Sequence, residues 1–158
     1  MKKIEAEDLE KDQLGGPAPK RMGVSVEVGK DILEIGTWSK IDGLGSICRL
    51  ELEVLGAKAL GVYYENFFIP EGGKLFLYNH DKTHIIGAFT SENNPSENLF
   101  STEFVQGDKV ILEYFQPENI AEKAQIFISE LAYAYRFISF AFTDDTRDQS
   151  WPCMINVA

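Results

Sequence analysis

Two histidines are the side chains best suited to acid–base chemistry in this chain of 158 residues. Nucleophilic catalysis requires a nucleophile, a base such as histidine and a group that orients the base, all in contact. His80 lies in the predicted hairpin loop 79–83, and His84 begins the strand predicted after it. No Gly-x-Ser-x-Gly or Gly-Asp-Ser-Gly-Gly stretch is present. The sequence therefore favours solvated loop histidines, and we expect no catalytic residue.

Carboxylates are abundant and could serve two other kinds of chemistry. A pair of carboxylates can hydrolyse a glycosidic bond, and Glu51 and Glu53 share one face of a predicted strand. Asp144, Asp145 and Asp148 could bind a hard cation, but the residue spacing of a calcium-binding loop is missing. We expect a solvated sheet face in the first case and a polar linker in the second, with no metal ion and no cofactor.

Cys48 and Cys153 are the two cysteines of the chain. Neither lies in a Cys-x-x-Cys or Cys/His pattern, so the sequence offers no zinc site. A disulfide requires Cα atoms within about 7 Å of each other, and sequence alone does not show whether these two residues approach that closely. Their pairing is left open by the residues themselves.

The charge balance narrows the range of partners. The chain has 25 acidic and 15 basic residues and a formal net charge of -10. Phosphate backbones and anionic lipid surfaces repel such a chain, so we expect neither nucleic acid nor a membrane as a partner. No run of about 18 apolar residues is present. The start, MKKIEAEDLEKDQ, lacks the apolar core of a signal peptide; the protein either stays inside the cell or has lost its signal.

The elements that would position these residues are mostly strands. Apolar and polar residues alternate at 24–28 and 46–54, and short turn sequences rich in Gly, Asp, Asn and Pro separate successive apolar segments. Strands are predicted at 24–28, 32–40, 46–54, 59–68, 74–78, 84–89, 99–105, 110–115 and 125–140. A buried helix is the alternative for the last segment. Nine short strands without βαβ alternation predict an all-β fold, an antiparallel β-sandwich of jelly-roll type.

Three regions follow from this pattern. Residues 1–23 form an amino-terminal arm, expected to be a tail with at most a turn or two of helix before the Gly- and Pro-rich stretch 15–19. Residues 24–142 form the sandwich domain. Residues 143–158 read as a polar linker and the truncated start of a following domain.

Aromatic residues supply the candidate binding surface. Tyr63-Tyr64 and Phe67-Phe68 are adjacent pairs on one predicted strand, so alternation directs one member of each pair outward. Exposed aromatic rings suit sugar or peptide binding. We take Trp38, Tyr64 and Phe67 as candidate binding residues, although tryptophan is more often found in a core or an interface.

Several ordered motifs, spread over residues 20–136, also resemble one protein family. The matching stretches are Lys20-Arg21-Met22-Gly23, Gly36-Thr37-Trp38, Ile47-Cys48-Arg49-Leu50, Gly56 to Leu60, Phe68 to Asn79, Gly87-Ala88-Phe89-Thr90 with Asn93-Asn94, Gly107 to Val110, Glu113-Tyr114 with Pro117, and Tyr135-Arg136. Together they resemble the amino-terminal, non-catalytic domain that precedes the trypsin-like domain in bacterial secreted proteases of the lysyl-endopeptidase type.

This resemblance implies a function without chemistry of its own. The domain would be the accessory or pro-domain of a secreted trypsin-like serine protease and would act by protein–protein contact, in folding, inhibition or targeting. Its partner would be a trypsin-like protease domain, in cis or in trans. The protein would be secreted or periplasmic, with its signal peptide absent from this chain.

The resemblance also bears on the carboxyl terminus. Residues 153–158 resemble the start of the protease portion, in which a second cysteine would follow Ala158. Cys153 would then lack its natural partner, and a Cys48–Cys153 bridge is not expected. The alternative function is a stand-alone jelly-roll module that binds carbohydrate or another exported protein.

Overall fold

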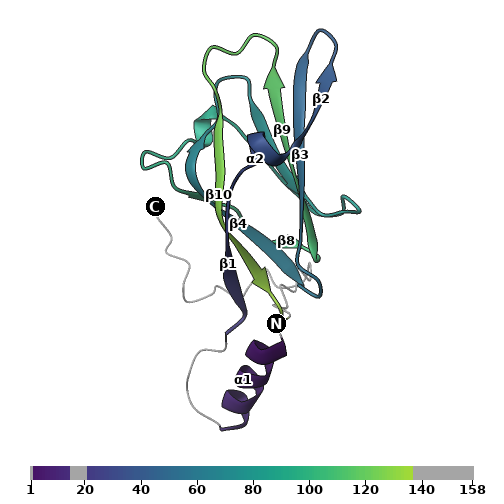
Figure 1. The fold of residues 1–158 in the computed structure, drawn as a ribbon, viewed down its shortest axis with the longest axis vertical. Helices are drawn as coiled ribbons and strands as arrows, with labels where there is room; N and C mark the ends of the chain where they lie inside the picture. The colour runs from purple at the N-terminus through teal and green to yellow at the C-terminus, as the bar shows by residue number, and fades with distance from the viewer. Residues whose placement is uncertain (1, 15–20, 137–158) are drawn as a thin grey trace, which may run out of the picture.

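The computed structural model describes residues 2–14 and 21–136, where ten strands form two five-stranded antiparallel sheets (Figure 1). Sheet A contains β1 (Gly23–Asp31), β4 (Ala59–Phe68), β7 (Phe100–Ser101), β8 (Val105–Gln106) and β10 (Gln125–Ala134). Sheet B contains β2 (Thr37–Ile41), β3 (Gly45–Glu53), β5 (Lys74–Tyr78), β6 (Ile85–Phe89) and β9 (Lys109–Pro117). The helices are α1 (Lys2–Gln13), α2 (Ile32–Ile35) and the short 3-10 helix η1 (Ser91–Asn93).

The strand order is that of a jelly roll. Sheet A runs β1-β10-β4-β7, with β8 also paired to β4, and sheet B runs β2-β3-β9-β5-β6. The chain crosses repeatedly between the sheets, and the last two long strands, β9 and β10, each lie between strands from the first half of the chain. β2 is an extra edge strand, joined to β3 by a tight turn. The predicted antiparallel β-sandwich is confirmed.

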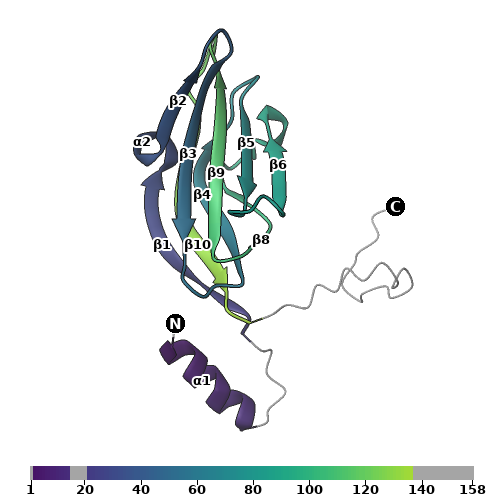
Figure 2. The same ribbon diagram turned by 90° about the vertical axis from the view of Figure 1, so that its right-hand side faces the viewer.

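The core lies between the two sheets, which Figure 2 shows from the side of sheet B. Along β9, Val110, Leu112 and Tyr114 are buried while the residues between them are partly exposed, as alternation requires. Burial of each such apolar side chain contributes roughly 1.5–3 kcal/mol. Phe100 of sheet A stacks on Phe67 at 4.3 Å between ring centroids and meets Phe89 of sheet B at 5.1 Å. The aromatic rings thus join the two sheets.

The predicted strand 32–40 is wrong in its first half. β1 continues to Asp31, whose side chain accepts a hydrogen bond of 2.8 Å from the backbone N–H of Leu33. This N-cap begins α2, and only then does the chain enter sheet B as β2. Gly36 lies between α2 and β2, where the chain passes from one sheet to the other. A side chain does not fit there, because a Cβ would lie 2.4 Å from the sulfur of Cys48.

One other expected element also differs. The predicted strand 99–105 is divided into β7 and β8. The strand predicted at 125–140 is confirmed from Gln125 to Ala134, so the alternative of a buried helix is excluded there. The remainder of that segment, the end of the predicted domain at 142 and the predicted linker at 143–158 lie outside the described residues.

The amino-terminal arm contains more structure than the sequence indicated. Residues Lys2–Gln13 form a helix of 12 residues, rather than a tail with a turn or two. Asp8 and Ile4, one turn apart on the same face, contact the sandwich. Within the described part of the chain, neither α1 nor any other helix is long and apolar enough to cross a membrane.

Candidate functional site

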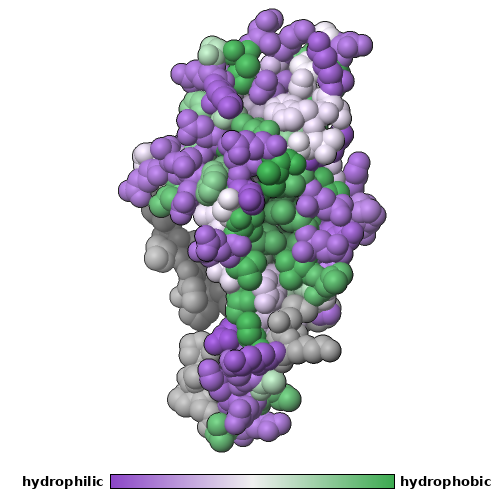
Figure 3. Space-filling model, in the orientation of Figure 1, coloured by the Kyte–Doolittle hydropathy of each residue, from purple (hydrophilic) through white to green (hydrophobic). Residues whose placement is uncertain are grey.

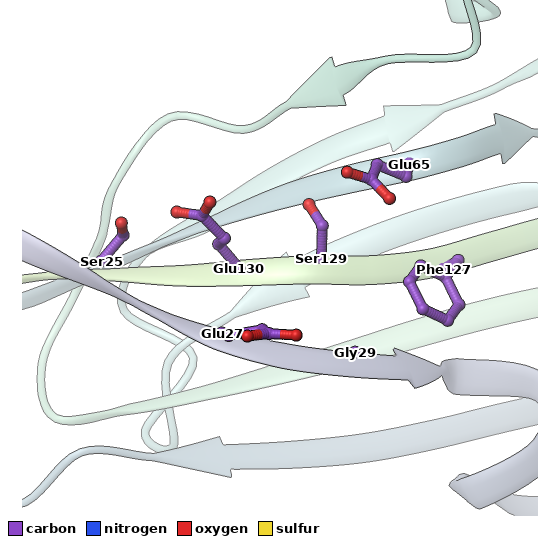
Figure 4. A pocket seen from close by; sticks show the side chains of 7 residues that line it. All are labelled: Ser25, Glu27, Gly29, Glu65, Phe127, Ser129 and Glu130. Atoms are coloured by element: carbon purple, nitrogen blue, oxygen red, sulfur yellow. The ribbon is translucent and has the colours of Figure 1, made fainter.

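Two β-bulges shape a shallow hollow on the outer face of sheet A (Figure 4). The register of β1 against β10 shifts between Glu27 and Lys30, and that of β10 against β4 shifts between Ile128 and Glu130. A bulge places two consecutive side chains on one face of a strand. Here Ser129 and Glu130 both lie on the outer face, and the hydroxyl of Ser129 donates to the carbonyl of Tyr63 at 3.2 Å.

The hollow continues toward β7. Its first part has a volume of about 470 Å³ and is lined by Ser25, Glu27, Gly29, Glu65, Phe127, Ser129 and Glu130. A second part of about 360 Å³ shares three of these residues and extends to Tyr63, Leu99 and Ser101. Together we call them the acidic groove. Both parts are open to solvent, which suits the side chains of a protein partner or an extended ligand better than an enclosed small molecule.

Charge in the acidic groove is unbalanced. Glu27 and Glu130 lie directly opposite each other in the β1–β10 register, an arrangement of like charges that destabilises a sheet. Glu65 lines the same groove from β4. None of these three glutamates forms an ion pair with a residue in the described ranges. The groove therefore favours cationic groups such as a lysine or arginine side chain.

An apolar band follows the neighbouring edge of the sandwich. β2 pairs with β3 from Gly45 to Arg49, so the rest of β3 has no neighbouring strand on that side in the described structure. Figure 3 shows hydrophobic surface continuing below α2 between β1 and β3. We define the apolar seam by Val26, which is exposed, and five partly exposed residues: Val24 and Val28 of β1, Leu50 and Leu52 of β3, and Val54, which follows β3.

β1 contributes to both surfaces. Ser25 and Glu27 point to the acidic groove. Val24 and Val26 lie opposite Tyr133 and Leu131 of β10 and belong to the apolar seam, where Val26 is 43% exposed. β1 is also an edge strand, with no described strand on its second side. An edge strand presents free N–H and C=O groups to which another chain can add. A segment lying along β1 would therefore reach apolar contacts on one side and carboxylates on the other.

The outer face of sheet B is different, because its charges are paired. The guanidinium of Arg49 donates to Glu113 at 2.7 Å, and the hydroxyl of Tyr78 donates to the same oxygen at 2.8 Å. Lys109 lies 3.2 Å from Glu51 and 3.6 Å from Glu53. This face is a network of internal contacts between neighbouring strands.

The network changes the ionisation of Glu113. Partial burial, the largest single influence, works to raise the pKa of this carboxyl, but the hydrogen bonds from Arg49 and Tyr78 and the positive charge of Arg49 outweigh it. The pKa of Glu113 is therefore lowered below its ordinary value. Burial and the hydrogen bond to Glu113 raise the pKa of Tyr78, so its hydroxyl stays a proton donor.

The candidate aromatic residues have different surroundings. Trp38 is exposed at the sandwich edge, and its indole N–H donates to the carbonyl of Leu33 at 3.0 Å. Tyr64 and Phe67 are buried, with exposed fractions of 1% and 0%, so their choice as surface aromatics is corrected. Asn66, with φ of 54°, interrupts the alternation of β4 and turns Phe67 to the same inner side as Tyr64. Tyr63, 45% exposed, is the outward ring.

One of the two histidines and the carboxylate pair have structural contacts, while His80 is exposed. The Nδ1 atom of His84 accepts a hydrogen bond of 3.1 Å from the backbone N–H of Gln106, which connects the β5–β6 hairpin to β8. Glu51 and Glu53 both pair with Lys109. Among the described residues, no three His, Cys, Asp or Glu side chains are grouped so that they could hold a metal ion. The predicted linker acids at 144–148 lie outside the described residues.

The groove glutamates were not identified from the sequence. Each lies on a different strand, and their meeting depends on strand order and on two bulges. The alternation Val24-Ser25-Val26-Glu27-Val28 was the one available signal, because it directs Glu27 outward.

Comparison with known proteins returned neither a matching family model nor a matching solved structure. The assignment of function therefore depends on the residues and geometry described above.

Proposed function

We propose that this domain is the non-catalytic amino-terminal accessory or pro-domain of a secreted trypsin-like serine protease, and that it acts by contact with the protease domain. The observation that carries the proposal is the edge of β1 that pairs with no other strand in the described ranges, with the apolar seam on one side and the acidic groove on the other. Exposed apolar patches beside polar residues are typical of protein–protein contact sites.

The resemblance of the motifs to the protease-associated family is a second support for the proposal, and several motif residues meet in space. Arg49 and Glu113, from two motifs, form the ion pair of sheet B. The side chain of Asn94 accepts a hydrogen bond of 2.7 Å from the N–H of Ile69 and donates one of 2.8 Å to its carbonyl. These motif residues therefore make contacts within the domain. The proposed contact with a protease would involve other residues, those of the apolar seam and the acidic groove.

The test is co-expression with a trypsin-like catalytic domain encoded beside or downstream of this sequence, followed by size-exclusion chromatography and an activity assay. We expect a complex and a change in the folding yield or activity of the protease. Val26→Arg should weaken the complex at least tenfold, because it places a charge in the apolar seam. Ile85→Arg is the matched control, since Ile85 is an exposed β-branched residue on the edge strand of sheet B.

Three outcomes would count against the proposal. The first is the absence of any complex with the wild-type domain. The second is a wild-type complex that leaves the yield and activity of the protease unchanged. The third is equal binding by Val26→Arg and Ile85→Arg, which would leave protein contact possible but would remove the seam as its location.

A carbohydrate-binding module is the second candidate, and the exposed Tyr63 in the acidic groove favours it. An aromatic ring beside carboxylates such as Glu65 and Glu130 is suited to stacking on a sugar and bonding its hydroxyls. A glycan array decides this: specific binding that is lost in Tyr63→Ala would support the carbohydrate function. Binding that survives this substitution, or no binding by the wild type, would exclude the groove as a sugar site.

A further inference from the structure

Among the side chains of helix α1 that the structure describes, all are exposed except Ile4 and Asp8. The helix lies beyond the end of the sandwich where β1 begins and β10 ends (Figures 1 and 2). Leu9 is exposed, and Ile4 is the apolar side chain of α1 that packs against the core. Asp8 is nevertheless only 4% exposed. A buried carboxylate is unfavourable unless it is paired and hydrogen-bonded, so the partners of Asp8 hold this helix in place.

Those partners come from the first and the last described residues of the sandwich domain, which lie together at one end of the sandwich. The hydroxyl of Tyr135 donates a hydrogen bond to Asp8. The guanidinium groups of Arg21 and Arg136 lie 3.8 Å and 3.9 Å from its two oxygens. Arg21 precedes β1 and Arg136 follows β10, and the N–H of Tyr135 donates to the carbonyl of Met22 at 3.2 Å. One carboxylate therefore binds the two arginines at which the chain enters and leaves the domain.

This arrangement has a consequence for proteolysis. A trypsin-like protease recognises the arginine before the cleaved bond by an acidic group in its specificity pocket. Asp8 holds the same guanidinium groups. A protease can therefore engage Arg21 or Arg136 only when Asp8 has released it.

We propose that α1 is a guard helix, anchored by Asp8, that protects the peptide bonds after Arg21 and Arg136 from arginine-specific proteolysis. When α1 is released, water hydrolyses the bond in the protease active site: the C–N bond after Arg21 breaks, the carbonyl carbon gains a hydroxyl, and the nitrogen of Met22 gains a proton. Detachment of α1 thus marks the domain for removal of its amino-terminal arm and for separation from whatever follows Arg136. The proposal does not depend on the proposed function, because any arginine-specific protease can serve as the probe.

The experiment is limited digestion by an arginine-specific endoprotease, with fragments assigned by mass spectrometry. The chain has four arginines; Arg147, outside the described residues, is changed to Lys in every variant. Asp8→Asn should raise the initial cleavage rates after Arg21 and Arg136 about tenfold, because cleavage follows the population of the released state. Glu10→Gln is the matched control, since it removes the same charge from an exposed position of α1, and it should leave both rates unchanged.

Arg49, within β3, reports global unfolding in the same digest. Its cleavage should stay slow in Asp8→Asn. If that variant does not fold, Tyr135→Phe removes one contact to Asp8 without changing a charge and should raise cleavage after Arg21 by a smaller factor. The proposal would be overturned by unchanged rates after Arg21 and Arg136 in folded Asp8→Asn. In Tyr135→Phe, it would be overturned by an unchanged rate after Arg21 or by equal acceleration at Arg21 and Arg49.

Discussion

The outer faces of the two sheets each carry three strand glutamates in the described part of the chain, but only one face neutralises them. In sheet B, Arg49 and Lys109 pair with all three, which are Glu51, Glu53 and Glu113. In sheet A, none of Glu27, Glu65 and Glu130 has such a partner. The alternation of polar and apolar residues is the same in both sheets, so it does not explain the difference.

The comparison separates two uses of a polar sheet face. Paired charges across neighbouring strands stabilise the fold and fix register. Unpaired carboxylates weaken the fold slightly and leave a negative potential that can attract a positively charged partner. By this criterion sheet B is the supporting face and sheet A is the face available for binding.

The largest expected difference between the faces is in stability. Glu113→Ala removes the acceptor of two charge-assisted hydrogen bonds and should lower the free energy of unfolding by about 1.5 kcal/mol. Glu65→Ala on sheet A should change it by about 0.5 kcal/mol or less. Urea unfolding of the two variants measures both values. Equal losses would show that the groove glutamate has a structural role of the same size.

Lowering the pH should reveal part of the stability that ionised Glu113 contributes. The folded-state pKa of Glu113 is lowered, so its stabilising effect is present above the pKa of an unfolded glutamate, about 4.3, and is lost as pH falls through the lower folded value. The stability difference between wild type and Arg49→Ala should therefore shrink as pH is reduced from 7 to 3. Urea midpoints at several pH values provide the measurement. A difference that is constant over this range would contradict the ionic character of the network.

On sheet A, removal of a glutamate charge is expected to raise the free energy of unfolding rather than lower it. Glu27→Gln removes one of two like charges that face each other across β1 and β10, and should raise the free energy of unfolding by about 0.5 kcal/mol at low salt. The gain should fall in 1 M salt, where screening acts within about 3 Å. Glu51→Gln, the counterpart on sheet B, should give no gain because it removes a partner of Lys109. Stabilisation by both substitutions would indicate only a relief of the overall negative charge.

The smallest change in stability is expected from substitution of Lys109. Its side chain is partly exposed, and its two glutamate neighbours raise the pKa of its amino group. Lys109→Met should lower the thermal midpoint slightly at low salt and not at all at high salt, since exposed ion pairs contribute little. Differential scanning calorimetry at two salt concentrations is the measurement. A large, salt-independent loss would mean that the methylene stem of Lys109 contributes by packing.

Much of the fold could be predicted because its signals are local. The predicted bounds 59–68 and 74–78 are those of β4 and β5, because a segment with proline and glycine, 69–73, separates two apolar stretches. α2 was missed because Ile32 and Ile35 favour strands, while the capping bond from Leu33 to Asp31 decides the local structure. The burial of Phe67 was missed because a single residue, Asn66, reverses the alternation.

The surfaces were harder to predict because they depend on distant pairing. Glu27 meets Glu130 only through the order of the strands in sheet A. The apolar seam exists because β2 is shorter than β3, which composition does not show. The contact of Asp8 with Tyr135 joins the two ends of the domain, and no local pattern in α1 distinguishes Asp8 from its acidic neighbours.

The thiol of Cys48 is buried where the chain passes from α2 to β2, and it is therefore unreactive in the folded protein. Cys48 is buried, its sulfur donates to the carbonyl of Ile32 at 3.3 Å, and burial, followed by the charge of Asp31, raises its pKa to about 11. Disulfide exchange requires an accessible thiolate, so thiol reagents can modify Cys48 only when the protein opens around α2. In a Cys153→Ser background, the rate at which a thiol reagent modifies Cys48 would measure how often the structure opens locally around α2.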